Sequence, residues 1–279
     1  MTRVRLLNCW VAAACVAVST SSMAALVDRG GGLIYDDVLD VTWLQDANFA
    51  ATSAPPPPDI CFDEGGGEIC FPGEPVRGRM TWEEAKAWVE GLSYEDTVRG
   101  VTWDDWRLPR VAPIDGVAFN NNNSTNASTD EGYAPTTTDG SDGGWRDTGG
   151  DAASEMGHMF YVNLANLGAC SPQSGGCTLQ DGRGLSNTGP FLNLAKGPDE
   201  FTNDYWTETP VGPAKAFYFN FKSGFQGRAD TDAAIGTTPD QLFAWAVRDG
   251  DVSVVPLPAA VWSLGAALAL LVAAQRRRS

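Results

Sequence analysis

Two apolar segments, one at each end of the chain, restrict where the residues between them can fold. Met1–Arg5 is positively charged, Leu6–Val18 is almost wholly apolar, and Ser19–Ala24 supplies small residues for a peptidase. This order predicts a secretory signal peptide over residues 1–24, cleaved after Ala24. The alternative, a transmembrane anchor, needs an apolar run of about 20 residues, and this run has about 13. We therefore expect the chain to be exported.

The C-terminal segment combines prolines, an apolar run and arginines. The prolines stand in the motif Val255, Pro256, Leu257, Pro258 and Ala259. The uncharged run then extends to Ala274, and the last arginines are Arg276, Arg277 and Arg278. Counted from Val254, about 21 residues form a helix just long enough to cross a hydrocarbon layer of about 30 Å. Because arginines stay cytoplasmic, the segment 253–279 is predicted to hold the domain, residues 25–252, outside the inner membrane.

The charge of that domain excludes one class of partner. The whole chain has 19 basic and 35 acidic residues, and five of the basic ones lie in the two terminal segments, which contain no acidic residue. The domain therefore has 14 basic and 35 acidic residues, a formal charge of −21. Such a charge repels nucleic acid, anionic lipid and sulfated polymers, and it favours cations and neutral or basic partners. Nucleic-acid binding is excluded as the main role.

Four cysteines remain once the signal peptide is removed, namely Cys61, Cys70, Cys170 and Cys177. An even number of cysteines in an exported chain predicts disulfides. Three pairings are possible, and the local ones, Cys61 with Cys70 and Cys170 with Cys177, need the least rearrangement of the chain. A zinc site is the alternative, but the close cysteine spacing of such sites is missing and the chain has one histidine.

Two segments have the pattern of amphipathic helices. Thr81 and Glu84 have the spacing of a capping box, and an apolar stripe follows at Ala85, Trp88, Val89 and Leu92. A second helix is predicted from Ser154, as its N-cap, through Leu167, with Gly168 ending it. Both helices should bury one face against a core.

The remaining pattern is β-like, with long loops. Residues 33–44 suit a hairpin of two short strands, and alternating aromatic residues predict strands at 216–221 and 243–248. Polar, Pro- and Gly-rich compositions mark insertions at 51–79 and 116–150. Helices and strands that are separate along the chain predict a single α+β domain with two main helices.

Four aspartates lie among glycines in the last part of the second insertion and directly after it, namely Asp139, Asp142, Asp147 and Asp151. An oxygen-rich, glycine-flexible loop of this kind could bind calcium. The spacing does not match an EF-hand, and a solvated acidic loop without any metal is the alternative.

A catalytic constellation is hard to assemble from this sequence. His158 is the only histidine, and Glu155 on the same helical face could join it in a metal pair. Its neighbours Met156, Met159 and Phe160 favour a structural histidine of the core instead. The sequence has no nucleophile motif such as Gly-x-Ser-x-Gly. A glycosidase that uses two carboxylates remains an alternative, because pairs of acidic residues are frequent in this sequence.

The tail from Val255 to Arg278 resembles PEP-CTERM sorting signals of the VPLPA type, since the motif, the hydrophobic span and the basic end occur in that order. The resemblance implies processing near the prolines by an exosortase-type membrane protease. It also implies delivery to the cell surface or exopolysaccharide matrix of a Gram-negative bacterium. Leu257 replaces the acidic residue of the commonest form, which leaves open the protease subtype that reads the tail.

The domain is similar to the family named for the C-terminal domain of the Legionella collagen-like adhesin. The segments that carry the similarity are 32–37, 42–48, 80–88, 105–109, 155–161, 205–207 and 244–248. The resemblance implies a C-type-lectin-like fold and adhesion to glycans. The founding adhesin is associated with sulfated polysaccharides through a basic surface, and a domain at −21 should not share that ligand.

These features lead to three hypotheses. The first is a noncatalytic surface or biofilm-matrix protein that binds exopolysaccharide or another envelope glycan, with calcium as a possible cofactor. The second is an inert structural matrix protein, and the third is a secreted polysaccharide hydrolase. The tryptophans could stack on sugars, but Trp82, Trp88, Trp106 and Trp245 have the pattern of core residues.

Overall fold

The protein is described by a computed structural model that covers most of the predicted domain. The described residues are 26–53, 78–136, 143–172, 176–195, 203–231 and 239–252, with the backbone alone of 60–63 and 68–71. The predicted signal peptide with Ala24, the sorting tail 253–279, Asp139 and Asp142 lie outside them. None of the helices in these ranges is long and apolar enough to cross a membrane.

The first sheet gathers both ends of the domain. Its four strands are β1 (Leu26–Asp28), β2 (Leu33–Asp36), β3 (Val41–Leu44) and β15 (Val247–Asp249), all antiparallel to their neighbours in that order. β2 and β3 form the hairpin predicted for residues 33–44. In the register, Leu26 lies opposite Asp36, Asp36 opposite Val41, and Val41 opposite Asp249. The N-terminal end of β1 and the C-terminal end of β15 therefore lie at the same end of this sheet.

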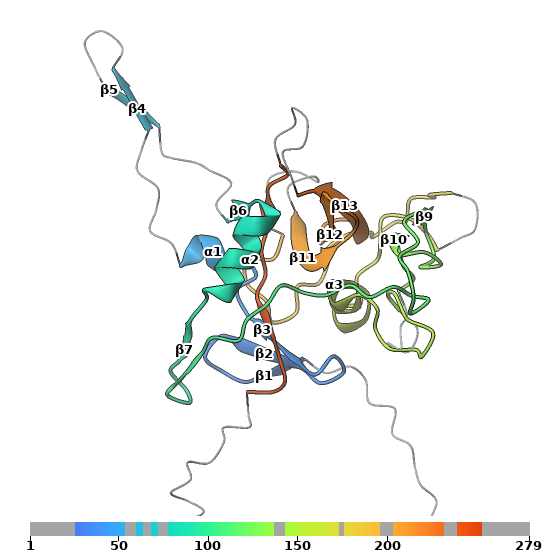
Figure 1. The fold of residues 1–279 in the computed structure, drawn as a ribbon, viewed down its shortest axis with the longest axis horizontal. Coiled ribbons are helices and arrows are strands. Elements are labelled where there is room, and N and C mark those ends of the chain that lie inside the picture. The colour runs from blue at the N-terminus through green and yellow to red at the C-terminus, as the bar shows by residue number, and fades with distance from the viewer. Residues whose placement is uncertain are drawn as a thin grey trace, which may run out of the picture.

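A second, seven-stranded sheet forms the other side of the domain (Figure 1). In spatial order its strands are β6 (Arg79–Met80), β14 (Leu242–Phe243), β11 (Asp204–Pro210), β12 (Lys215–Asn220), β13 (Phe225–Asp230), β10 (Glu131–Gly132) and β9 (Asn123–Ser124). β12 covers most of the strand predicted at 216–221, and its inward residues Phe217 and Phe219 are fully buried. Two sheets with few helices confirm the α+β class.

Two further hairpins complete the strands. β4 (Ile60–Asp63) and β5 (Glu68–Phe71) pair within the first insertion, and β7 (Tyr94–Asp96) pairs with β8 (Val101–Trp103). The insertion at 51–79 is therefore not structured as a loop throughout.

The helices agree with the prediction in one case and differ in the other. α1 (Phe49–Thr52) is a single turn, and α2 (Trp82–Glu90) starts at Thr81 with both hydrogen bonds of the capping box. α3 (Glu155–His158) begins at the predicted cap, where the Ser154 hydroxyl accepts from the Gly157 N–H. It continues as a π-helical segment, η1 (Met159–Asn163), and ends well before Gly168.

The early end of the second helix follows from a buried side chain. Asn166 is fully buried, and its Oδ1 accepts from the N–H groups of Ser186 and Asn187. Its Nδ2 donates to the Asn187 carbonyl. These bonds fix Asn166 against a distant segment, and Ala165 before it takes a φ of 50°, which is incompatible with a helix. The predicted extension to Leu167 was wrong.

The strand predicted at 243–248 is interrupted. β14 belongs to the seven-stranded sheet and β15 to the four-stranded sheet, so Ala244, Trp245 and Ala246 connect the two. Trp245 is fully buried there, with its ring centroid 4.6 Å from that of Trp43 and 5.5 Å from that of Phe221. The residues predicted to share one face, Phe243, Trp245 and Val247, are all buried, but Ala244 and Ala246 between them are buried as well, because the segment crosses from one sheet to the other.

The insertion at 116–150 is also more ordered than its composition predicts. It contributes β9 and β10 to the large sheet, and Trp145 from its end is buried against Tyr161 and Phe219. Asp130 holds the backbone of this segment in place, because its two carboxylate oxygens accept from the N–H groups of Ile114 and Asn120. Polar residues that bond their own backbone allow such a segment to pack without a core of its own.

Candidate functional site

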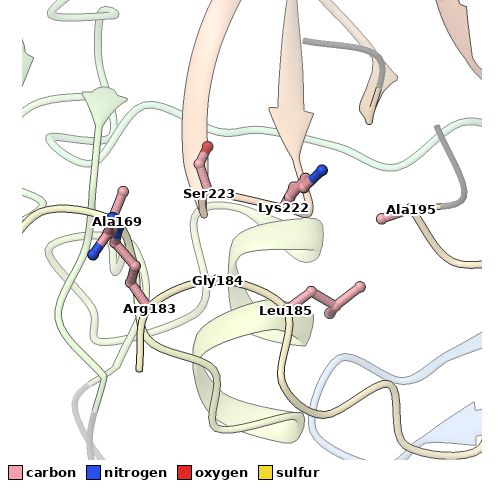
Figure 2. Close-up of a pocket in the computed structure, with 7 residues that line it drawn as sticks. All are labelled: Ala169, Arg183, Gly184, Leu185, Ala195, Lys222 and Ser223. Carbon is pink, nitrogen blue, oxygen red and sulfur yellow. The ribbon is translucent and has the colours of Figure 1, made fainter. Parts of the chain in front are cut away.

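A pocket of about 390 Å³ lies at the turn between β12 and β13, a size typical of small-molecule sites. Figure 2 shows Lys222 and Ser223 of this turn at one edge and Arg183 across from Lys222. Ala169, Gly184, Leu185 and Ala195 complete the lining.

The turn itself is encoded by Asn220 and Gly224. The Asn220 Oδ1 accepts from the N–H groups of Lys222 and Ser223 at 2.9 and 2.8 Å, and from the Ser223 hydroxyl at 3.0 Å. Gly224 closes the turn with a φ of 78°, which glycine adopts at little cost. An asparagine and a glycine around a short polar stretch thus hold Lys222 at the pocket edge.

A disulfide supports the opposite wall. Cys170 and Cys177 are bonded, as predicted for the local pairing, and Ala169 next to them donates its N–H to the Ser223 carbonyl. The Gln180 amide donates to the carbonyls of Gly168 and Cys170. Arg183 in turn donates to the Gln180 carbonyl, so the disulfide loop positions this arginine at the pocket.

The second predicted disulfide is described at the level of the backbone only. Cys61 of β4 lies directly opposite Cys70 of β5 in the register of the hairpin. Their side chains lie outside the described atoms, so this pairing stays a prediction.

Gly184 brings the two walls together. A Cβ at this position would lie 2.8 Å from the Lys222 carbonyl oxygen, and the residue has a φ of 95°. Both the close backbone approach and the backbone conformation require glycine here. The shape of the pocket at Gly184 therefore depends on the contact between the segment after the disulfide and the β12–β13 turn.

The cations of this pocket differ electrostatically from most others in the domain. Most described arginines and lysines form an ion pair with a carboxylate, namely Arg29, Lys86, Arg99, Arg107, Arg110, Lys215, Arg228 and Arg248. Arg183 and Lys222 pair with no carboxylate among the described residues, and both are exposed. The pocket therefore holds positive charge that its described neighbours do not neutralise, on a strongly acidic domain.

Tryptophan does not contribute to this site. Trp43, Trp145, Trp206 and Trp245 are fully buried, Trp82 and Trp106 are buried, and Trp88 and Trp103 are partly buried against the core. The core positions predicted for the tryptophans are confirmed for Trp82, Trp106 and Trp245, and Trp88 packs against the core but is only partly buried. The pocket lining contains no aromatic ring, so a ligand there would be held by polar contacts.

A second hollow, of about 280 Å³, contains one of the aspartates proposed for calcium. It is lined by Val38, Leu39, Arg146, Asp151, Ala152 and Glu155. Asp147 lies beside it, and its Oδ1 accepts from the N–H groups of Gly149 and Asp151 at 2.8 and 3.0 Å. Among the described residues no group of three or more histidine, cysteine or acidic side chains is placed to hold a metal. The calcium site therefore stays a prediction, because Asp139 and Asp142 are not described.

Glu155 and His158 do not form the metal pair that their spacing allowed. Both Glu155 oxygens accept from the Arg107 guanidinium, at 2.7 and 2.8 Å, and one also accepts from the Arg110 N–H. His158 is 1 % exposed, and burial lowers the pKa of its imidazole to about 4. The charge of Arg146 lowers this pKa further, while Asn163 and Asp37 oppose the shift. His158 is thus a neutral histidine of the core at physiological pH.

A buried carboxylate lies on the other side of Asn163. Asp36 is fully buried, its Oδ2 accepts from the Asn163 amide, and its Oδ1 accepts from the N–H groups of Val38 and Leu39. Burial raises its pKa to about 6 although these hydrogen bonds lower it. Asp96 holds a similar turn in the β7–β8 hairpin, where its Oδ1 accepts from the N–H groups of Val98 and Arg99. Its carboxylate also pairs with the Arg99 guanidinium, and the pKa of Asp96 is lowered although burial raises it.

These two buried groups lead to a prediction for the pH dependence of stability. Asp36 takes up a proton more readily when folded, so its contribution to the free energy of unfolding rises as the pH falls from about 6 towards 3.8. His158 resists protonation when folded, so its contribution falls as the pH drops from 6.5 towards about 4. Each effect is about 3 kcal/mol, and they have opposite signs. On acidification from pH 6.5 to 4.5, the free energy of unfolding of Asp36→Asn should therefore fall by about 2 kcal/mol relative to that of the wild type.

Urea unfolding at several pH values measures this difference. Asp96→Asn is the matched control, because it alters the same turn without removing a group that titrates in this window. His158→Gln should show the reverse slope to Asp36→Asn. Parallel pH profiles for the wild type and Asp36→Asn would show that Asp36 is ionised over the whole range.

The two most specific segments of the family resemblance lie side by side. The N–H and carbonyl of Arg107 exchange hydrogen bonds with those of Val247, at 2.8 and 3.0 Å. The Arg248 guanidinium lies 4.2 Å over the Trp103 ring and pairs with Asp105. These contacts give the Trp-Arg-Leu-Pro and Ala-Trp-Ala-Val-Arg segments a structural role.

No family model, curated protein or solved structure matches this chain significantly. The site is therefore assigned from its own residues. Arg183, Lys222 and Ser223 were not predicted as site residues. The turn pattern from Asn220 to Gly224 was visible in the sequence, but which described carboxylates lie near the two cations depends on residues far along the chain.

Proposed function

We propose that the protein is an exported, noncatalytic component of the cell surface or biofilm matrix that binds exopolysaccharide or another envelope glycan. The pocket between Arg183 and Lys222 carries this proposal. It combines exposed hydrogen-bond donors with a wall held by a disulfide, and a bond of that kind persists outside the cytoplasm. A site with a fixed wall and exposed donors suits a soluble polar ligand such as a sugar chain.

The route to this location rests on the two terminal segments. An exosortase-type protease would read the tail that begins at Val255, after a signal peptidase has cut behind Ala24. The position of both ends supports this route, because Leu26 and Asp249 lie in one row of the four-stranded sheet. Both membrane-directed segments would then leave from one end of that sheet. A C-type-lectin-like arrangement of the domain is part of the same proposal.

The environment of the polar groups supports a noncatalytic role. The Ser223 hydroxyl donates to Asn220 and accepts from the Phe225 N–H at 3.3 Å, which occupies it within the turn. His158, the base that a serine nucleophile would need, is buried and does not line the pocket. We therefore propose binding rather than hydrolysis.

Binding of the full-length chain to immobilised dextran, xanthan and alginate tests the function. We expect at least one of these polysaccharides to retain the protein without releasing reducing sugar. The double variant Arg183→Gln/Lys222→Gln should lose this retention. If the whole panel fails while the protein remains in purified matrix, the inert structural alternative replaces our proposal, and sugar release would favour a hydrolase.

Mass spectrometry of the matrix-associated protein tests the sorting. We expect the residues beyond the proline motif, with Arg276, Arg277 and Arg278, to be missing. A matrix protein that retains the three arginines would contradict processing by an exosortase.

A further inference from the structure

We infer that the pocket binds an acidic saccharide, with Arg183 and Lys222 each taking a carboxylate of a uronic-acid-containing segment. This inference rests on the proposed glycan-binding function and names the chemistry of the ligand. Most other cations of the domain pair with a carboxylate, whereas these two have no such partner among the described residues.

Unpaired cations are unusual in a domain with this excess of carboxylates. Arg107, Arg99 and Arg248 each lie within 2.8 Å of a carboxylate oxygen. Among the described residues, Arg183 has the Gln180 carbonyl as its hydrogen-bond acceptor, and Lys222 has no carboxylate partner. The two charged residues that line the pocket are thus both cations, opposite in sign to the domain, and charges further than a Debye length of about 8 Å from them are largely screened.

The lining determines how a sugar could be held. Lectin-type stacking needs an exposed aromatic ring, and none of the lining residues has one. The remaining source of affinity is the charge-assisted hydrogen bond, which is roughly twice as strong as a bond between neutral groups. A guanidinium in particular matches the two oxygens of a carboxylate.

The arrangement of the two cations restricts the ligand further. Figure 2 shows Arg183 and Lys222 on different sides of the pocket, with Gly184 between them. Two separated cations suit a chain whose carboxylates stand on different sugars. A densely sulfated polymer would bring further charges against the acidic surface around the pocket, including the exposed Asp181 next to this wall. Sparse carboxylates avoid that repulsion.

Binding of a defined oligosaccharide tests this inference. The probe is a tetrasaccharide of alternating glucuronate and neutral hexose, and its control is the same molecule with the carboxyl groups reduced to alcohols. By calorimetry on the full-length chain we expect the acidic form to bind at least about tenfold more tightly than the reduced form. Arg183→Gln and Lys222→Gln should each weaken the acidic form about five- to tenfold, and their effects should multiply because the contacts are separate.

Arg79→Gln is the matched control variant. Arg79, like Arg183, makes a hydrogen bond to one backbone carbonyl, that of Gln241, but it lies outside the pocket. It should bind the acidic tetrasaccharide as the wild type does. Equal affinity for the acidic and reduced forms, or equal loss in all three variants, would overturn the inference. Retention on dextran with no preference for the acidic probe would overturn it while leaving the proposed function intact, and failure of every glycan would remove both.

Discussion

Replacing Arg107 with alanine is expected to lower the free energy of unfolding by about 3–5 kcal/mol, because it leaves a carboxylate buried without its cation. The side chains of Arg107 and Glu155 are 11 % and 13 % exposed, and two hydrogen bonds join them. Burial alone would lower the pKa of Arg107, but the hydrogen bonds and charges of Glu155 and Asp249 raise it well above its ordinary value. The guanidinium also fixes Asp249 at the end of β15.

The neighbouring arginine provides the control for this prediction. Arg110 contacts Glu208 and the same Asp249, but its side chain is 49 % exposed. Arg110→Ala should therefore cost no more than about 1 kcal/mol. The double variant Arg107→Ala/Glu155→Gln should recover part of the loss, since the unpaired charge is gone. Urea unfolding at neutral pH measures all three, and a loss for Arg107→Ala as small as that for Arg110→Ala would contradict a buried pair.

Replacing Trp245 with alanine is also expected to lower the free energy of unfolding by about 3–5 kcal/mol, because it removes a large buried side chain from the core. The side chain is fully buried where the chain passes between the two sheets. Its ring packs 4.6 Å from Trp43 and 4.8 Å from Phe191, measured between centroids. Its indole N–H also donates to the Leu44 carbonyl at 2.7 Å. Truncation would open a cavity between the sheets and leave that carbonyl without its donor.

Two further variants separate these contributions. Trp245→Phe keeps an aromatic ring and loses the indole N–H, so it should cost clearly less than Trp245→Ala. Trp88→Ala removes the same side chain from a partly buried position on α2 and should also cost less. The thermal unfolding midpoints of the three variants, compared with that of the wild type, measure these losses. Equal losses for Trp245→Ala and Trp88→Ala would mean that the crossover is not a centre of the core.

Prediction from sequence succeeded where the determinants are close together in the chain. The capping box of Thr81 and Glu84 spans one helical turn, and the hairpin at 33–44 needs only its own turn. The Cys170–Cys177 bridge closes a short loop, and alternation alone placed Phe217 and Phe219 inside. In each case the pattern and the structure depend on neighbouring residues.

Prediction failed where a distant segment decides the outcome. The helix after Ser154 ends early because Asn166 bonds to residues 186 and 187, and the strand at 243–248 is divided because two sheets compete for it. The polar composition of 116–150 concealed Trp145, which is buried against a strand about 70 residues later. Periodicity cannot reveal which partner a segment will meet.

The sequence by itself determined the α+β class, the local hairpins and caps, and the overall acidic charge. Only the tertiary structure decided which charges remain available. The pKa of Asp96 is lowered by Arg99, only three residues along the chain, whereas the pKa of Asp36 is raised by burial that only the fold produces. Likewise, Arg107 is neutralised by residues far along the chain, whereas Arg183 and Lys222 are left to face a pocket. Electrostatic interaction depends on distance in space, and folding sets that distance independently of separation along the chain.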